Sequence, residues 1–214
     1  MRVATAPVGA VFADMLSPLT QAQAIALSDY TIPGTRTGLT GVSRYLENLS
    51  AQELAWVLSA GLAVMLVGES RPNGWLPSAG LGAADGMREL RLARALGADL
   101  PGMTIGCDLE GMSGGPQETI DYSKAWCGVI QPAHLIAMGY NGSGVPLTPQ
   151  GLYQLPFTRY WKSLSNVGPV ANVDYCMLQL YPTLTLTLPT GMLDVDLDVV
   201  QEDKLSRLPT MLVA

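Results

Sequence analysis

The sequence predicts one α/β domain over residues 1–214, folded as a lean (β/α)8 barrel of the TIM type with some outer helices shortened. Short apolar runs alternate with longer amphipathic segments along the chain, which is typical of strands joined by helical crossovers. There are eight such runs, and a length of 214 residues lies near the lower limit for this barrel. An open, doubly wound sheet is the structural alternative.

The eight expected strands are apolar runs of five to seven residues. The run 62–68 is almost wholly apolar, as in a strand covered on both faces of a parallel sheet. After residue 140 the alternation weakens, and the segments between the last runs resemble loops with short helical turns. The expected strands cover 8–13, 41–45, 62–68, 103–109, 135–140, 157–162, 175–181 and 195–200.

Four helices are expected from their end signals. Ser50 and Glu53 have the spacing of a capping box, in which each side chain satisfies a free backbone N–H of the first turn. Gly61 and Gly97 supply helix stops, and Pro116 suits a first helical turn. The expected helices cover 20–27, 51–60, 83–96 and 116–130.

Composition excludes several classes of protein. With 48% hydrophobic and 14% charged residues, the chain is neither disordered nor collagen-like. A net charge of −6 with dispersed Lys and Arg argues against nucleic-acid binding. The uncharged stretches are too short or too often broken by proline to span a membrane, and no export signal is evident. Three widely spaced cysteines fit neither a disulfide framework nor a metal site.

Acidic residues recur where the expected strands end. Asp14, Glu69, the pair Asp108 and Glu110, and Asp196 with Asp198 all lie at or within such strands. The carboxyl ends of barrel strands open onto one face, where such enzymes place their chemistry. The sequence therefore predicts a converging acidic site, although a solvated strand end remains the alternative interpretation of each acid.

The Asp108-Leu109-Glu110 segment is the sharpest signal. Side chains alternate along a strand, so the two carboxyl groups should project together while Leu109 packs on the other side. Neighbouring carboxylates disfavour simultaneous ionisation, which raises one pKa and keeps a proton available near neutral pH. Cleavage of a glycosidic bond requires an acid for the leaving oxygen and a second carboxylate for the developing positive charge.

Aromatic and amide side chains also lie at or near expected strand ends. Sugar sites use aromatic faces for stacking, with hydroxyl and amide groups for orientation. For any one of these residues, packing in the core is the competing interpretation. The candidate substrate-binding residues are Tyr45, Glu69, Tyr140, Trp161, Gln179 and Tyr181.

These residues, in this order, resemble a family. Ser43-Arg44-Tyr45-Leu46, Leu49 to Glu53, Asp108-x-Glu110, Gln179-x-Tyr181 and Val195 to Val199 are similar to the glycoside-hydrolase-like barrels related to glycoside hydrolase family 25, the lysozyme-type muramidases of phages and bacteria. The segments around Arg44 and Ala60 are especially like the subgroup known as domain of unknown function 1906. The resemblance extends over nearly the whole chain.

The resemblance implies a function and a set of roles. Glu110 would be the general acid, and Asp108 would stabilise the transition state or hold the substrate's N-acetyl group. Asp14 and Asp196 would complete the site. The implied substrate is an N-acetylated glycan, most simply peptidoglycan, cleaved without a metal or cofactor. Because no export signal is seen, an endolysin-like or virion-associated phage protein is expected, acting from a phage particle or from the host cytoplasm.

Two other interpretations remain. The first is a barrel that binds glycan, or builds a phage particle or cell envelope, without turnover. The second rests on Gly111-x-Ser113-x-Gly115, the pattern of a nucleophilic serine elbow, with His134 as the one histidine of the chain. That triad would have to fit within a short segment around a helix. No P-loop or dinucleotide-binding glycine motif is present in the sequence.

Overall fold

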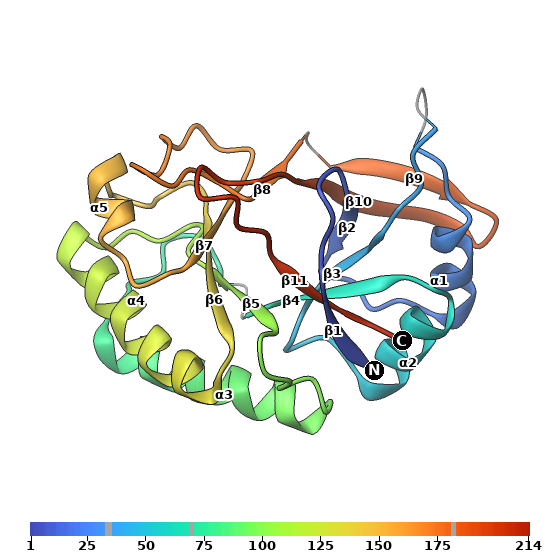
Figure 1. Ribbon diagram of the computed structural model, residues 1–214, viewed down its shortest axis with the longest axis horizontal. Helices are drawn as coiled ribbons and strands as arrows, with labels where there is room; N and C mark the ends of the chain where they lie inside the picture. The colour runs from blue at the N-terminus through green and yellow to red at the C-terminus, as the bar shows by residue number, and fades with distance from the viewer. Residues whose placement is uncertain (33–35, 69–70, 181–182) are drawn as a thin grey trace.

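The computed structural model describes residues 1–32, 36–68, 71–180 and 183–214 (Figure 1). Eight strands form a closed barrel, in the order β2, β3, β4, β5, β6, β7, β8 and β10, with β10 returning to β2. Pairing of β4 with β5 closes the ring, so the open doubly wound sheet is ruled out. The barrel strands are β2 (Val11–Met15), β3 (Gly41–Tyr45), β4 (Ala63–Val67), β5 (Thr104–Asp108), β6 (Ile136–Asn141), β7 (Arg159–Lys162), β8 (Met177–Gln179) and β10 (Gly191–Val200).

The predicted TIM-type barrel with shortened outer helices is thereby confirmed, and each of the eight expected strands overlaps one barrel strand. Four helices follow β2 to β5, the short α5 follows β6, and the described residues after β7 and β8 form no helix. The helices are α1 (Gln21–Ser28), α2 (Ala51–Ser59), α3 (Ala79–Ala95), α4 (Pro116–Ile130) and α5 (Pro149–Tyr153), and a 3-10 turn (Gln131–Ala133) follows α4.

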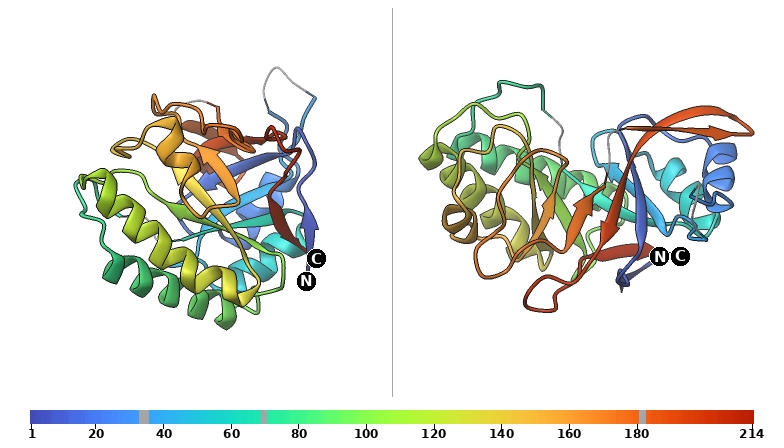
Figure 2. Two further views of the ribbon diagram at one scale, coloured as in Figure 1. Left: turned by 60° about the vertical axis from the view of Figure 1, so that its left-hand side comes forward. Right: turned by 90° about the horizontal axis from the view of Figure 1, so that it is seen from above.

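One expectation for the barrel is wrong: the last strand is not parallel. β10 runs antiparallel to both neighbours, β2 and β8. The reason lies in the connection before it, because β9 (Leu184–Leu188) and β10 form a hairpin, and a tight turn reverses the chain where a helical crossover would not. The hairpin extends beyond the barrel toward α1 (Figure 2, right).

Two further strands, absent from the prediction, join the chain ends to the barrel. β1 (Arg2–Thr5) pairs with β11 (Thr210–Val213), and β11 lies against β4 through Leu212 and Val64. Thr210 of β11 also bonds with Thr104 at the start of β5. The two termini consequently lie next to each other (Figure 1).

Alternation of side chains gives the molecule two apolar layers. One set of strand residues faces the surrounding helices, and α3 and α4 lie side by side over part of the barrel (Figure 1). The other set fills the barrel and includes Phe12, Met65, Met138, Trp161 and Met177. Residues two positions away from these point into the same interior, and this brings the polar residues at the strand ends together.

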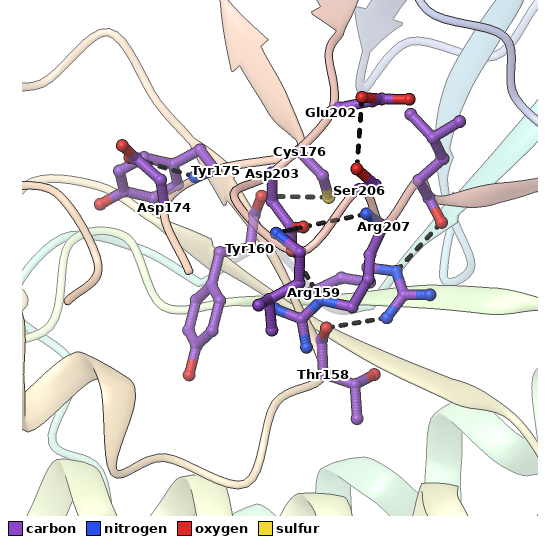
Figure 3. Close-up of polar contacts among 12 residues, drawn as sticks. Thr158, Arg159, Tyr160, Asp174, Tyr175, Cys176, Glu202, Asp203, Ser206 and Arg207 are labelled. Carbon is purple, nitrogen blue, oxygen red and sulfur yellow. Dashed lines mark hydrogen bonds and ion pairs between the residues drawn. The ribbon is translucent and has the colours of Figure 1, made fainter. Parts of the chain in front are cut away.

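The end of the barrel where the parallel strands begin is closed by a polar network (Figure 3). Asp203 accepts hydrogen bonds from the backbone and from the Nε of Arg207, the latter at 2.7 Å. Arg159, at the start of β7, donates to the carbonyl oxygens of Thr158 and Leu208. The Arg159–Leu208 hydrogen bond joins the segment after β10 to the first residue of β7.

Candidate functional site

A cleft of about 580 Å³ opens at the end of the barrel where the parallel strands finish. Acidic or phenolic side chains in its lining come from five strands or the loops that follow them: β2, β3, β5, β6 and β10. Residues 15–17, directly after Asp14, form a further part of the wall. The predicted residues among those that line it are Asp14, Tyr45, Asp108, Glu110, Tyr140 and Asp196. The described part of the chain therefore brings together six of the ten candidates at one surface.

The floor of the cleft is an aspartate pair on adjacent antiparallel strands. Asp14 of β2 is directly opposite Asp196 of β10 in the register, and Asp198 lies opposite Phe12. Because β10 is antiparallel, Asp196 reaches the cleft from the middle of its strand. Asp198 is fully buried below, where the indole Nε1 of Trp161 donates to it at 3.1 Å.

Burial and mutual repulsion make these carboxyl groups hard to ionise. Loss of solvent, followed by the charges of Asp196 and Asp108, raises the pKa of Asp14 from 3.8 to about 8, against a lowering effect of Arg44. Burial and the charge of Asp14 also raise the pKa of Asp198. The pKa of Asp196 is raised, first by burial. The floor thus retains protons at a pH where exposed aspartates are ionised.

The Asp108 and Glu110 carboxyl groups line the same cleft, as the alternation predicted, while Leu109 between them is buried in the outer core. Asp108 ends β5, and its Oδ1 accepts the backbone N–H of Glu110 at 2.8 Å. Burial is the main cause that raises the pKa of Asp108 to about 7, and the charge of Glu110 adds to it. The raised pKa expected for one member of the pair therefore falls on Asp108.

Glu110 lies just beyond the strand and is held by neighbouring loops. Its Oε1 accepts hydrogen bonds from the Ser165 hydroxyl at 3.1 Å and the Ser143 backbone N–H at 3.3 Å. Its carbonyl oxygen accepts from the indole of Trp75 at 2.8 Å. A side chain at Gly142 would collide with the Glu110 carboxyl group, because a Cβ there would lie 2.3 Å from Oε1.

Tyr45, Tyr140 and Gln179 make polar contacts with the acids in two separate sets. The Tyr45 hydroxyl lies 3.4 Å from Asp108 Oδ2. The Tyr140 hydroxyl donates to Gln179 Oε1 at 3.2 Å, and Gln179 Nε2 donates to Asp196 Oδ2 at 2.6 Å. Burial raises the pKa of both tyrosines, so their hydroxyl groups remain protonated donors.

The other four candidate substrate-binding residues are not among the described residues that line the cleft. Trp161 is 0% exposed and lies behind Tyr140, with ring centroids 4.3 Å apart, so it supports the cleft from below and does not reach its surface. Gln179 is hydrogen-bonded to Tyr140 and Asp196, two residues that line the cleft. Glu69 and Tyr181 lie outside the residues that the structure describes.

Sequence reasoning missed the residues supplied by loops. Arg71 lines the cleft, is held by Asp85 of α3 at 2.5 Å, and lies over the ring of Trp75. Asn73, Ser143 and Thr183 line it as well. Their position after predicted strands was the available signal, because the loops that follow barrel strands build such sites.

The serine-elbow alternative is not supported by the geometry. Ser113 lies before α4 and donates to the carbonyl oxygen of Gly74, whereas His134 follows the 3-10 turn after that helix. A helix of 15 residues is about 22 Å long, so the two side chains are held apart. Within the described residues, no group of three His, Cys, Asp or Glu side chains is arranged to hold a metal ion.

Comparison with known proteins identifies a protein of similar fold. No protein-family model matches the chain, and no curated protein matches it. The chain is similar in structure to an uncharacterized B. stearothermophilus protein known from a 1.07 Å crystal structure, with a TM-score of 0.64 and 12% sequence identity. The match covers 94% of this chain and 100% of that one. At this identity, the likeness extends to the barrel fold alone.

No helix in the described ranges is long and apolar enough to cross a bilayer.

Proposed function

We propose that this protein is a glycoside hydrolase acting on an N-acetylated glycan, most simply peptidoglycan, with Glu110 as general acid and Asp108 as its stabilising partner. The observation that carries the proposal is the convergence of Asp14, Asp108, Glu110 and Asp196 in one open cleft at the carboxyl end of the barrel. Chemistry in this fold is placed at that end.

The contacts of Glu110 suit a proton donor to a leaving group. Two donors hold its Oε1, and the side chain lines the cleft, so the carboxyl group is fixed within reach of a bound substrate. General acid catalysis at the glycosidic oxygen requires such a positioned carboxyl group. The loops that hold Glu110 therefore define where the leaving oxygen would lie.

The remaining acids suit a positively charged transition state. Asp108 has a pKa of about 7, so a developing positive charge at the anomeric carbon would favour its carboxylate form. Asp14 and Asp196 lie in the cleft floor with raised pKa values, and a developing positive charge would favour their carboxylate forms as well. Tyr45 and Tyr140 are largely buried but line the cleft, so they supply hydroxyl groups that could bond to sugar hydroxyls and N-acetyl groups.

The test is release of reducing ends from purified peptidoglycan between pH 5 and pH 8. Glu110→Gln should lower the rate about 100-fold or more, the usual contribution of a general acid, because the amide has no proton of suitable acidity. Asp108→Asn and Asp14→Asn should also be slow. Glu202→Gln is the matched control, since Glu202 is exposed and lies in the network at the closed end of the barrel.

Two outcomes would count against the proposal. An unchanged rate in Glu110→Gln would remove this residue from the mechanism. Binding of peptidoglycan by the wild-type protein without release of reducing ends would favour the glycan-binding alternative. Circular dichroism and the melting temperature of each variant separate loss of chemistry from loss of fold.

A further inference from the structure

A buried ion pair lies directly behind the cleft wall and takes no part in the chemistry proposed above. Arg44 of β3 and Glu53 of the first turn of α2 are 0% and 2% exposed, with Arg44 Nε 2.8 Å from Glu53 Oε1. Tyr45 lines the cleft, so the alternation of β3 places Arg44 on the opposite face, toward the helices. Removal of two charges from water is costly, so such a pair calls for a reason beyond packing.

The pair holds both ends of one segment of backbone. Arg44 Nη1 donates to the carbonyl oxygen of Met15, the residue after Asp14. Glu53 Oε1 accepts the backbone N–H of Leu19 at 3.1 Å. Between these two anchors lie Leu16 and Ser17, which form part of the cleft lining.

We propose that Arg44 and Glu53 are positioning residues that clamp the segment Met15–Leu19, and through it Asp14, in the conformation that completes the cleft. This inference rests on the cleft being the functional site, as in the proposed function, but it does not depend on which reaction occurs there. Neither residue lines the cleft, so both act through the segment that they hold.

The charges around Asp14 give the clamp an electrostatic consequence. Asp196 and Asp198 face Asp14 from β10, Asp108 faces it from β5, and Tyr45 and Arg44 act on it from β3. Arg44 is the cation of this group and lowers the pKa of Asp14, whereas the aspartates raise it. Loss of Arg44 should therefore raise the pKa of Asp14 further.

The test uses NMR on the free protein and needs no substrate. In the double variant Arg44→Met with Glu53→Leu, neither partner remains as an uncompensated buried charge, so the fold should persist. We expect the backbone order parameters of Leu16 and Ser17 to fall from the rigid range, about 0.85, toward the flexible range below about 0.6. The carboxyl titration of Asp14 should move upward by about one pH unit.

Arg44→Lys and Arg94→Met complete the experiment. Lysine keeps the charge but lacks the planar fork that contacts Glu53 and Met15 together, so it should hold the Asp14 titration near its wild-type pH with an intermediate loss of order at Leu16 and Ser17. Should the double variant fail to fold, Arg44→Lys carries the test alone. Arg94 belongs to an exposed pair with Asp99 at the far end of α3, and its replacement should change neither readout.

The proposal is overturned if the double variant, or Arg44→Lys where the double variant does not fold, keeps wild-type order at Leu16 and Ser17. An unchanged Asp14 titration in the double variant would overturn the inference that Arg44 lowers the pKa of Asp14. Failure of the proposed hydrolase function would leave both readouts intact. Where hydrolysis is measured, the double variant should also show a shifted pH profile of kcat/KM, which a loss of stability alone would not produce.

Discussion

At the scale of single residues, the acids of this protein derive their properties from the side of the strand on which they lie. Asp14, Asp108 and Asp196 each occupy a position that points into the barrel, where burial raises their pKa. Glu110 differs, because it lies beyond β5 and depends on loop contacts for its orientation. The proposed hydrolysis should therefore be sensitive to small changes in the loops that hold Glu110.

Gly142→Ala tests that sensitivity. The three atoms nearest to the added Cβ would all belong to the side chain of Glu110, at 2.3–2.7 Å, and a flexible side chain can move aside. We expect the melting temperature to change little and hydrolysis to fall at least about tenfold, because a shift of about 1 Å in a catalytic group can cost on the order of 100-fold.

The matched control for Gly142→Ala is Gly80→Ala, where nothing lies within 4 Å of the new Cβ. Reducing-end release and thermal melting are measured on both variants. Wild-type hydrolysis by Gly142→Ala would contradict the view that Glu110 must keep its present position.

At the scale of elements, the close packing of α3 on α4 supports one side of the cleft. Asp85 of α3 holds Arg71 in the cleft lining and accepts a hydrogen bond from Tyr122 of α4 at 2.8 Å. Gly82 permits this approach, since a Cβ there would lie 2.2 Å from the backbone oxygen of Tyr122. The helices and the cleft are thus coupled through one network.

Gly82→Ala should separate these helices. Backbone atoms cannot yield as a side chain does, so we expect a loss of about 2 kcal/mol in the free energy of unfolding, in the usual range for overpacking. Gly128→Ala, in α4 with open space around its Cβ, should instead stabilise by about 0.5–1 kcal/mol through helix propensity. Urea unfolding of both variants measures the difference, and equal stabilities would contradict the proposed close contact.

At the scale of the whole molecule, the protonated floor of the cleft links stability to pH. The folded-state pKa values of Asp14 and Asp108 are about 8 and about 7, above the value of 3.8 for an unperturbed aspartate. Between pH 3.8 and these higher folded-state pKa values, Asp14 and Asp108 keep protons in the folded state that the unfolded chain has already released. The contribution of these groups to stability is therefore complete below about pH 4 and is lost as the pH rises toward 8.

Asp14→Asn isolates this effect. Because an amide carries no charge, we expect the variant to melt a few degrees higher than wild type at pH 8, as is common when a strained functional group is removed. The fall in melting temperature between pH 4 and pH 8 should also be shallower. A difference in melting temperature between Asp14→Asn and wild type that stays constant from pH 4 to pH 8 would contradict the protonated floor.

The fold was predictable to a large extent because its signals are local. A strand such as β4 is recognised by its continuous apolar run, and α2 by the Ser50 cap, whose hydroxyl accepts the Glu53 N–H at 3.1 Å. β1, β9 and β11 escaped prediction because their pairing partners decide whether these short segments become strands. The antiparallel direction of β10 depends on the same hairpin.

Local residue patterns were sufficient to predict the alternation of strands and helices, and with it which acids lie at or within strands. Period-two alternation is a property of the local backbone, so it predicted the inward direction of Asp108 at the end of β5, whereas Glu110 lies beyond the strand and is oriented by Ser143 and Ser165. The tertiary structure alone places Asp14 opposite Asp196, Trp161 beneath the cleft, and the Arg44–Glu53 pair in hydrogen bonds to the backbone of Met15 and Leu19. Those relations depend on the closure of the barrel, which joins residues far apart in the chain, and on the burial that closure produces.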